Sequence, residues 1–138
     1  MAQLKRWAKM KKIITTLFLL FALAAYAKDD FSKSLINEAS AYLTKKESQK
    51  ISAEIELLRK APTQSGIAYP KYYIWVRGVN PENKTITEGA MRLAEIENSN
   101  FKITDFVTRD SIISDPLQLD MIFPKALVPL IRQKAERK

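Results

Sequence analysis

Residues 69–79, Tyr-Pro-Lys-Tyr-Tyr-Ile-Trp-Val-Arg-Gly-Val, are the stretch that decides the fold. Its centre, from Tyr72 to Val76, consists of aromatic and β-branched residues, which favour a pleated strand. Gly78 and Pro81 follow, and such residues are typical of the end of a strand. The stretch therefore predicts a β-strand, and the segments after and before it are interpreted in relation to this strand.

The segment after this strand predicts a helix and a second strand. Thr85-Ile86-Thr87-Glu88 matches a capping box, in which the Thr and Glu side chains bind free N–H groups at the start of a helix. Apolar residues follow at helical spacing as far as the turn Asn98-Ser99-Asn100, so we expect a helix over about residues 86–97. Residues 101–108 have strand composition. The result is a β-α-β unit, with a right-handed crossover if its strands are parallel.

Two strands make a poor sheet, so a further pairing element is expected. Residues 111–114 could supply another short strand, or an unpaired sheet edge could pair with a partner or with a second copy of the chain. The C-terminal segment predicts a helix that begins at Asp115-Pro116, a suitable N-cap and first-turn pair. Pro124 and Pro129 must interrupt or restart that helix.

Residues 28–60 predict a helical arm in two parts. Two apolar helical stripes lie about half a turn out of phase, the first being Phe31, Leu35, Ala39, Tyr42 and Leu43 and the second Ile51, Ile55 and Leu58. Residues 44–47, Thr-Lys-Lys-Glu, match a second capping box between them, so we expect helices over residues 30–43 and 45–60. A loop at residues 61–66 would separate this arm from a small α/β domain of residues 67–138. The chain is thus predicted to be a single domain of α+β or small α/β class.

Residues 1–27 have the pattern of a signal peptide. Five cations precede an apolar run from Ile13 to Ala25, and the run ends at Ala25-Tyr26-Ala27, with small residues where a signal peptidase reads them. We expect cleavage after Ala27, since the apolar run is shorter than the roughly 20 residues of a spanning helix. An uncleaved membrane anchor is the alternative. The signal predicts export, to the periplasm of a Gram-negative bacterium or, as a second choice, out of the cell.

Composition excludes several classes of function. The 138 residues include 23 Lys and Arg against 15 Asp and Glu. Cleavage of the signal peptide would remove five of the cations and leave 18 basic against 15 acidic residues. So small an excess of positive charge argues against a nucleic-acid partner. The chain has no Cys and no His, which removes disulfides, the common zinc sites and nucleophile-histidine catalysis. Its three glycines are separate, so no phosphate-binding loop is present. We therefore expect no cofactor, no metal and no catalytic site.

One candidate partner surface lies on the predicted strand. Lys71, Tyr73, Trp75 and Arg77 alternate with their neighbours and therefore share one face. If that face is exposed, its aromatic and cationic side chains could stack on bases, sugars or a partner protein. The alternative is a core face, because a Trp on a strand that is covered on both sides is usually buried.

The leading hypothesis is a small exported, non-catalytic binding or interaction protein whose partner is another envelope protein. An accessory component of a secretion, pilus or conjugation apparatus is the first alternative. The second is a carboxylate-dependent hydrolase of cell-wall glycan, which needs two carboxyl groups about 5 to 9.5 Å apart. The acids available for that chemistry are Glu82, Glu88, Glu95 and Glu97.

Overall fold

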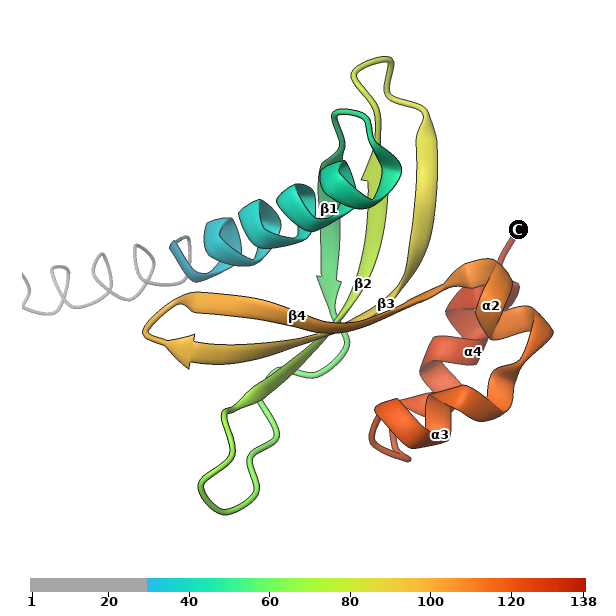
Figure 1. Cartoon of the computed structure of the whole chain (residues 1–138). Coiled ribbons are helices and arrows are strands. Elements are labelled where there is room, and N and C mark those ends of the chain that lie inside the picture. Colours follow the sequence, from blue (N-terminus) through green and yellow to red (C-terminus); the bar gives the residue numbers. More distant parts are fainter. Residues whose placement is uncertain (1–29) are drawn as a thin grey trace, which may run out of the picture. The chain divides into compact units, whose positions relative to one another are not determined.

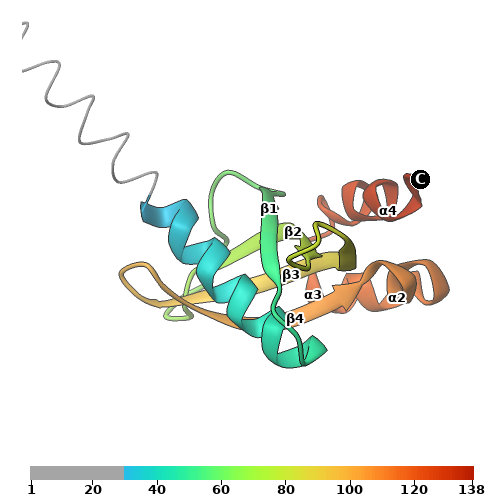
Figure 2. The same cartoon turned by 90° about the horizontal axis from the view of Figure 1, so that it is seen from above.

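The fold is a mixed α+β domain. The computed structural model describes residues 30–138, of which residues 34–138 form one compact unit. This unit contains a four-stranded sheet with helices on both of its faces (Figure 1, Figure 2). The prediction of a single α+β domain is confirmed. The predicted signal peptide at residues 1–27, with Ala25 and Ala27 at its cleavage site, lies outside the described residues.

The sheet is an antiparallel meander. Its strands, in spatial order, are β1 (Ser52–Leu57), β2 (Lys71–Val79), β3 (Thr85–Glu97) and β4 (Asn100–Thr108). β2 and β4 confirm the two predicted strands. Only residues 80–84 separate β2 from β3 and only residues 98–99 separate β3 from β4, and turns this short join antiparallel strands. The predicted β-α-β unit, with a helix between its strands, is therefore wrong.

Residues 85–97 form β3, one of the two inner strands of the sheet, and not a helix. Ala90, Met91, Leu93 and Ala94 are all buried, because both faces of this strand are covered. A strand buried on both faces carries an apolar run without strict alternation, and such a run resembles helical spacing. Thr85 does not cap a helix; it begins the strand.

The chain before β2 contains one helix and one strand. The helix covers residues 30–47, so the predicted helix over 30–43 is confirmed and extends one turn further. It ends before Ser48, whose φ of 54° is the left-handed conformation common at helix ends. The predicted helix over residues 45–60 is wrong, because buried Ile51 and Ala53 alternate with exposed neighbours and lead into β1.

Residues 61–66 join β1 to β2 and do not separate an arm from a domain. β1 and β2 pair antiparallel over the whole length of β1, and residues 34–47 of the helix belong to the same compact unit as both strands. Within the connection, the backbones of Thr63 and Lys71 exchange two hydrogen bonds of 2.9 and 2.8 Å. The predicted loop thus exists as the connection of a long hairpin.

Helix 30–47 packs on one face of the sheet through Leu35, Ala39 and Leu43, which are fully buried. On the same face the Tyr72 ring packs edge-on against Phe101 of β4, with 5.5 Å between ring centroids. Partial burial, together with the nearby Glu95 carboxylate, raises the pKa of the Tyr72 hydroxyl above its ordinary value.

The C-terminal helices cover the opposite face of the sheet. They are α2 (Arg109–Ser114), the short 3-10 helix η1 (Pro116–Gln118), α3 (Leu119–Ile122) and α4 (Val128–Glu136). Their apolar residues form one buried cluster with Tyr73, Trp75, Ala90 and Val107 of the sheet. Residues 111–114 therefore belong to a helix and not to the predicted extra strand, because the Thr108 hydroxyl accepts a hydrogen bond from the Ser111 backbone and caps α2.

The prolines of this segment act as expected. Pro116 begins η1 in the predicted first-turn position, although the Asp115 side chain makes no capping hydrogen bond. Pro124 lies between α3 and α4, and Pro129 lies in the first turn of α4, where its missing N–H is tolerated. The single C-terminal helix of the prediction is therefore a series of short ones.

Candidate functional site

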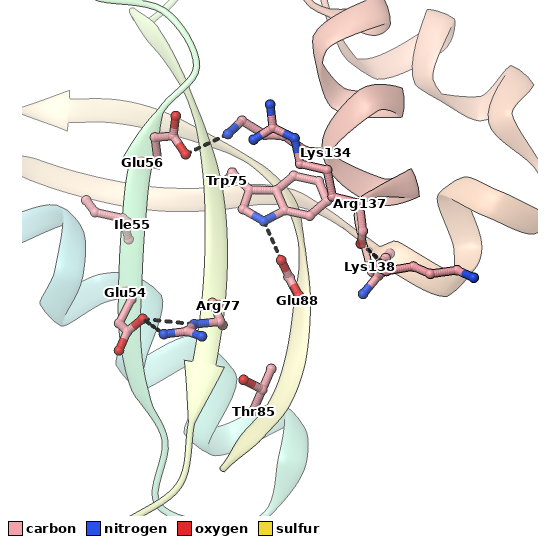
Figure 3. Close-up of a pocket in the computed structure, with 11 residues that line it drawn as sticks. Glu54, Ile55, Glu56, Trp75, Arg77, Thr85, Glu88, Lys134, Arg137 and Lys138 are labelled. Carbon is pink, nitrogen blue, oxygen red and sulfur yellow. Dashed lines mark hydrogen bonds and ion pairs between the residues drawn. The ribbon is translucent and has the colours of Figure 1, made fainter. Parts of the chain in front are cut away.

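An open groove of about 640 Å³ lies where β1, β2 and β3 meet the C-terminal segment (Figure 3). Most of its lining is charged. Its acids are Glu54, Glu56 and Glu88, and its cations are Arg77, Arg109, Lys134, Arg137 and Lys138. The β1 side of the groove is acidic, whereas the side formed by α2, α4 and the residues after α4 is basic. The groove therefore presents opposite charges along two of its walls.

Ion pairs hold both acids of β1. Arg77 Nε donates to Glu54 Oε2 at 2.9 Å, and Cα pairing places these two residues directly opposite each other on β1 and β2. Lys134 Nζ donates to Glu56 Oε2 at 2.6 Å and joins α4 to β1 (Figure 3). The Glu54 and Glu56 side chains are still 51% and 63% exposed, so both carboxylates remain accessible to a ligand. The Arg77–Glu54 pair is exposed on both sides and contributes only about 0 to 1 kcal/mol to stability, whereas the Lys134 side chain is only 10% exposed.

Trp75 forms part of the groove's floor. Its indole Nε1 donates to Glu88 Oε1 at 2.9 Å, which satisfies the one polar atom of the indole side chain (Figure 3). The residue is only 7% exposed, because the C-terminal helices cover the ring. Only the edge of the indole therefore reaches the groove.

Arg109 closes the groove at the end of α4. Its Nε donates to the carbonyl oxygen of Ala135 at 2.7 Å, and its guanidinium also binds the carbonyl oxygen of Arg137. Carbonyl groups at the end of a helix lack partners within the helix and carry partial negative charge, so a guanidinium is a suitable cap. This contact ties the first residue of α2 to the last turn of α4.

The four residues of the predicted partner surface have different surroundings. Tyr73, Trp75 and Arg77 lie on one sheet face, as their spacing predicts, but Tyr73 and Trp75 are 5% and 7% exposed. The Tyr73 hydroxyl lies 2.6 Å from Thr63 Oγ1, and its ring packs against Phe123. Lys71 does not line the groove, whereas Arg77 is exposed within it. Of the two alternatives, the core face is therefore observed at Tyr73 and Trp75, which the C-terminal helices cover, whereas Arg77 on the same face is exposed.

The residues that sequence reasoning missed come from β1 and from the C-terminal segment. Glu54 and Glu56 were assigned to a helix, although acids at alternate positions between apolar residues would have indicated a strand with one charged face. Lys134 lies in the last turn of α4, where basic residues are common because they suit the helix dipole. Its pairing with Glu56 spans 78 residues of chain, and no local pattern signals such a contact.

Of the four carboxylates considered for hydrolysis, only Glu88 lines the groove. Glu88 lines the groove, whereas Glu95 lies seven residues along the same strand, about 23 Å away at the rise of a strand. Glu97 is more distant still, and Glu82 lies in the turn between β2 and β3. The separation of Glu88 from Glu95 exceeds the distance that a glycosidase carboxylate pair requires.

Comparisons with known proteins found no relative of the chain. No protein-family model matches the chain, no curated protein is significantly similar in sequence, and no solved structure is significantly similar to it. Within residues 30–138, no helix is long and apolar enough to cross a membrane. In the same part of the chain, no cluster of three or more acidic, histidine or cysteine side chains is arranged to hold a metal ion.

Proposed function

We propose that the protein is an exported, non-catalytic binding protein that contacts another protein of the cell envelope through the charged groove. The observation that carries this proposal is the groove itself, with accessible acids on β1 facing cations from the C-terminal segment. Charged groups arranged in this way favour specificity and orientation of a partner more than they favour affinity. The signal-like residues 1–27 support a place in the periplasm.

The contacts of the three groove acids support binding over catalysis. Glu54 is held by Arg77, Glu56 by Lys134, and Glu88 by the indole N–H of Trp75. Each carboxylate thus has a partner that positions it, and Glu88 and Glu95 of the hydrolase hypothesis lie about 23 Å apart along β3. An accessory role in a secretion, pilus or conjugation apparatus is a narrower form of the same proposal, because it names the partner's assembly.

Export is tested by the N-terminus of the protein recovered outside the cytoplasm. We expect that product to begin at Lys28, because a signal peptidase cleaves after small residues such as Ala27. Replacing Ala27 with lysine should leave the precursor uncut, and N-terminal sequencing or intact mass reports both results. Recovery of the full-length chain in the soluble periplasmic fraction would contradict the proposed cleavage.

Partner binding is tested by photo-cross-linking from within the groove. Thr85 lines the groove and is exposed, so a photoreactive amino acid at this position should cross-link one defined envelope protein in living cells. The matched control position is Lys102, which is exposed on β4 and does not line the groove. If both positions give the same adducts, or neither gives any, the groove is not the contact surface. Loss of envelope assembly on gene deletion would support the narrower accessory role.

A further inference from the structure

The outer edge of β1 is divided into a sealed half and an open half. The backbone N–H of Leu58 donates to the carbonyl of Tyr73 at 2.9 Å, in register with the pairing of β1 and β2. Hydrogen-bonded pairs alternate along an antiparallel ladder, so Glu56 and Glu54 direct their backbone groups toward β2. Ile55 and Leu57, between and beyond them, therefore direct their N–H and C=O groups outward.

Side chains of helix 30–47 seal the first half of this edge. Thr44 Oγ1 accepts a hydrogen bond from the backbone N–H of Ile51 at 3.0 Å and donates to its carbonyl oxygen at 3.2 Å. Ser40 Oγ accepts from the N–H of Ala53 at 2.9 Å. The helix thereby takes the place of a neighbouring strand at the beginning of β1.

The second half of the edge has no such cover. Within the described part of the chain, no hydrogen bond satisfies the outward backbone groups of Ile55 or Leu57. The Leu57 side chain is 41% exposed, and Ile55 borders the charged groove. Natural proteins usually protect an edge strand, because a row of free donors and acceptors is a template for pairing with another chain. The open half of the β1 edge can therefore accept an added strand, whereas the half that is bonded to helix 30–47 cannot.

The charges beside the open edge indicate what kind of strand fits. Glu54 and Glu56 lie on one face of β1, and residues directly opposite each other on neighbouring strands share a face. A second copy of the chain fits poorly, because antiparallel registers that pair Ile55 with Ile55 or with Leu57 place glutamate opposite glutamate. A strand with basic residues at these positions would instead complete the charge pattern.

We propose that the open half of the β1 edge binds an extended segment of the partner protein in which basic and apolar residues alternate. The segment's backbone bonds to Ile55 and Leu57, and its basic side chains meet Glu54 and Glu56 at the acidic wall of the groove. Its apolar side chains lie on the other face, beside the exposed Leu57. This inference rests on the proposed binding function and specifies its partner chemistry and mode of contact.

The test is a titration followed by nuclear magnetic resonance of the isotope-labelled protein recovered after export. The probe is the blocked peptide Lys-Val-Lys-Val-Lys, with Glu-Val-Glu-Val-Glu as its charge-reversed control. We expect the lysine peptide to shift the amide signals of Ile55 and Leu57 and to slow their hydrogen exchange, and the glutamate peptide to do neither. If the lysine peptide leaves both amides unchanged, or if both peptides act equally, the proposal is wrong.

Ile55→Pro provides the decisive variant, because it removes an outward N–H while leaving the ladder to β2 intact. We expect it to weaken peptide binding about tenfold, whereas Ile55→Val, which keeps the N–H, should bind as the wild type does. Equal affinity of both variants would overturn edge docking. Thr85 cross-linking separates this outcome from failure of the proposed function: a specific groove adduct without an edge response would retain the groove as a binding site and reject strand addition.

Discussion

Replacing Gly89 with alanine is expected to destabilise the domain by about 3 kcal/mol or more, at the upper end of the cost of overpacking. Gly89 lies in β3, where a Cβ atom would come within 2.2 Å of the carbonyl oxygen of Val107 and 2.9 Å of the Cα of Thr108. Both are backbone atoms of β4, so no rotamer change can relieve the contact. The two strands must separate locally, which breaks hydrogen bonds at the end of the β3–β4 pairing. Thermal unfolding should show a Tm lowered by about 12 °C or more.

Gly78→Ala is the matched control for that prediction. A Cβ atom at Gly78 would meet methyl groups of Ile51, Thr87 and Leu43 at 2.9 to 3.1 Å. These are the ends of side chains, which can move by a few tenths of an ångström, so the expected loss is about 1 kcal/mol. Urea unfolding of the two variants gives the comparison. A Gly78→Ala variant as unstable as Gly89→Ala would contradict the close approach of β3 and β4.

β2 and β4 could be predicted because their patterns are local. The centre of β2 is aromatic and β-branched, and its end is marked by Gly78, so composition alone distinguishes it from a helix. β4 follows a turn at Asn98 and Ser99, and Ser99 adopts a φ of 59° there. In both cases the residues that decide the structure lie within the element or directly beside it.

β3 and β1 could not be predicted in the same way, because their apolar patterns depend on distant parts of the chain. β3 is buried on both faces only because helix 30–47 covers one and the C-terminal helices cover the other. Its cluster Ala90, Met91, Leu93, Ala94 has no alternation that would reveal a strand. β1 is short, and the alternation of its acids at positions 54 and 56 covers too few residues to outweigh the helical spacing of Ile51, Ile55 and Leu58.

The candidate site could not be predicted in full for the same reason: it depends on distant parts of the chain. Arg77 and Trp75 were identified from the strand that carries them, but whether their face is open depends on α3 and α4, which follow it by more than 40 residues. The acidic wall of the groove comes from β1 and the basic wall from α4 and the residues after it. A site assembled from three separate parts of the chain has no sequence motif, and only the fold brings those parts together.

Trp75 lies where the domain's core borders the charged groove, so Trp75→Ala should destabilise the domain whatever its effect on binding. Truncation of a buried Trp typically costs about 3 to 5 kcal/mol, from lost apolar contact and the cavity that remains. Trp75 is packed among Leu119, Phe123 and Ile131 in the buried cluster. Removing it also leaves the Glu88 carboxylate without its indole donor. We expect urea unfolding to show a loss of this size.

Arg77→Ala is the matched control, because Arg77 lies two residues along the same strand face but is exposed in the groove. Its ion pair with Glu54 contributes about 0 to 1 kcal/mol, so the variant should melt within a few degrees of the wild type. It should nevertheless reduce the cross-link formed at Thr85, since it alters the charge that a partner meets.

If instead Trp75→Ala melts like the wild type and abolishes the cross-link, the indole contributes to binding and not to the core. That result would restore the stacking surface of Tyr73, Trp75 and Arg77, and it would require the C-terminal helices to leave this face in solution.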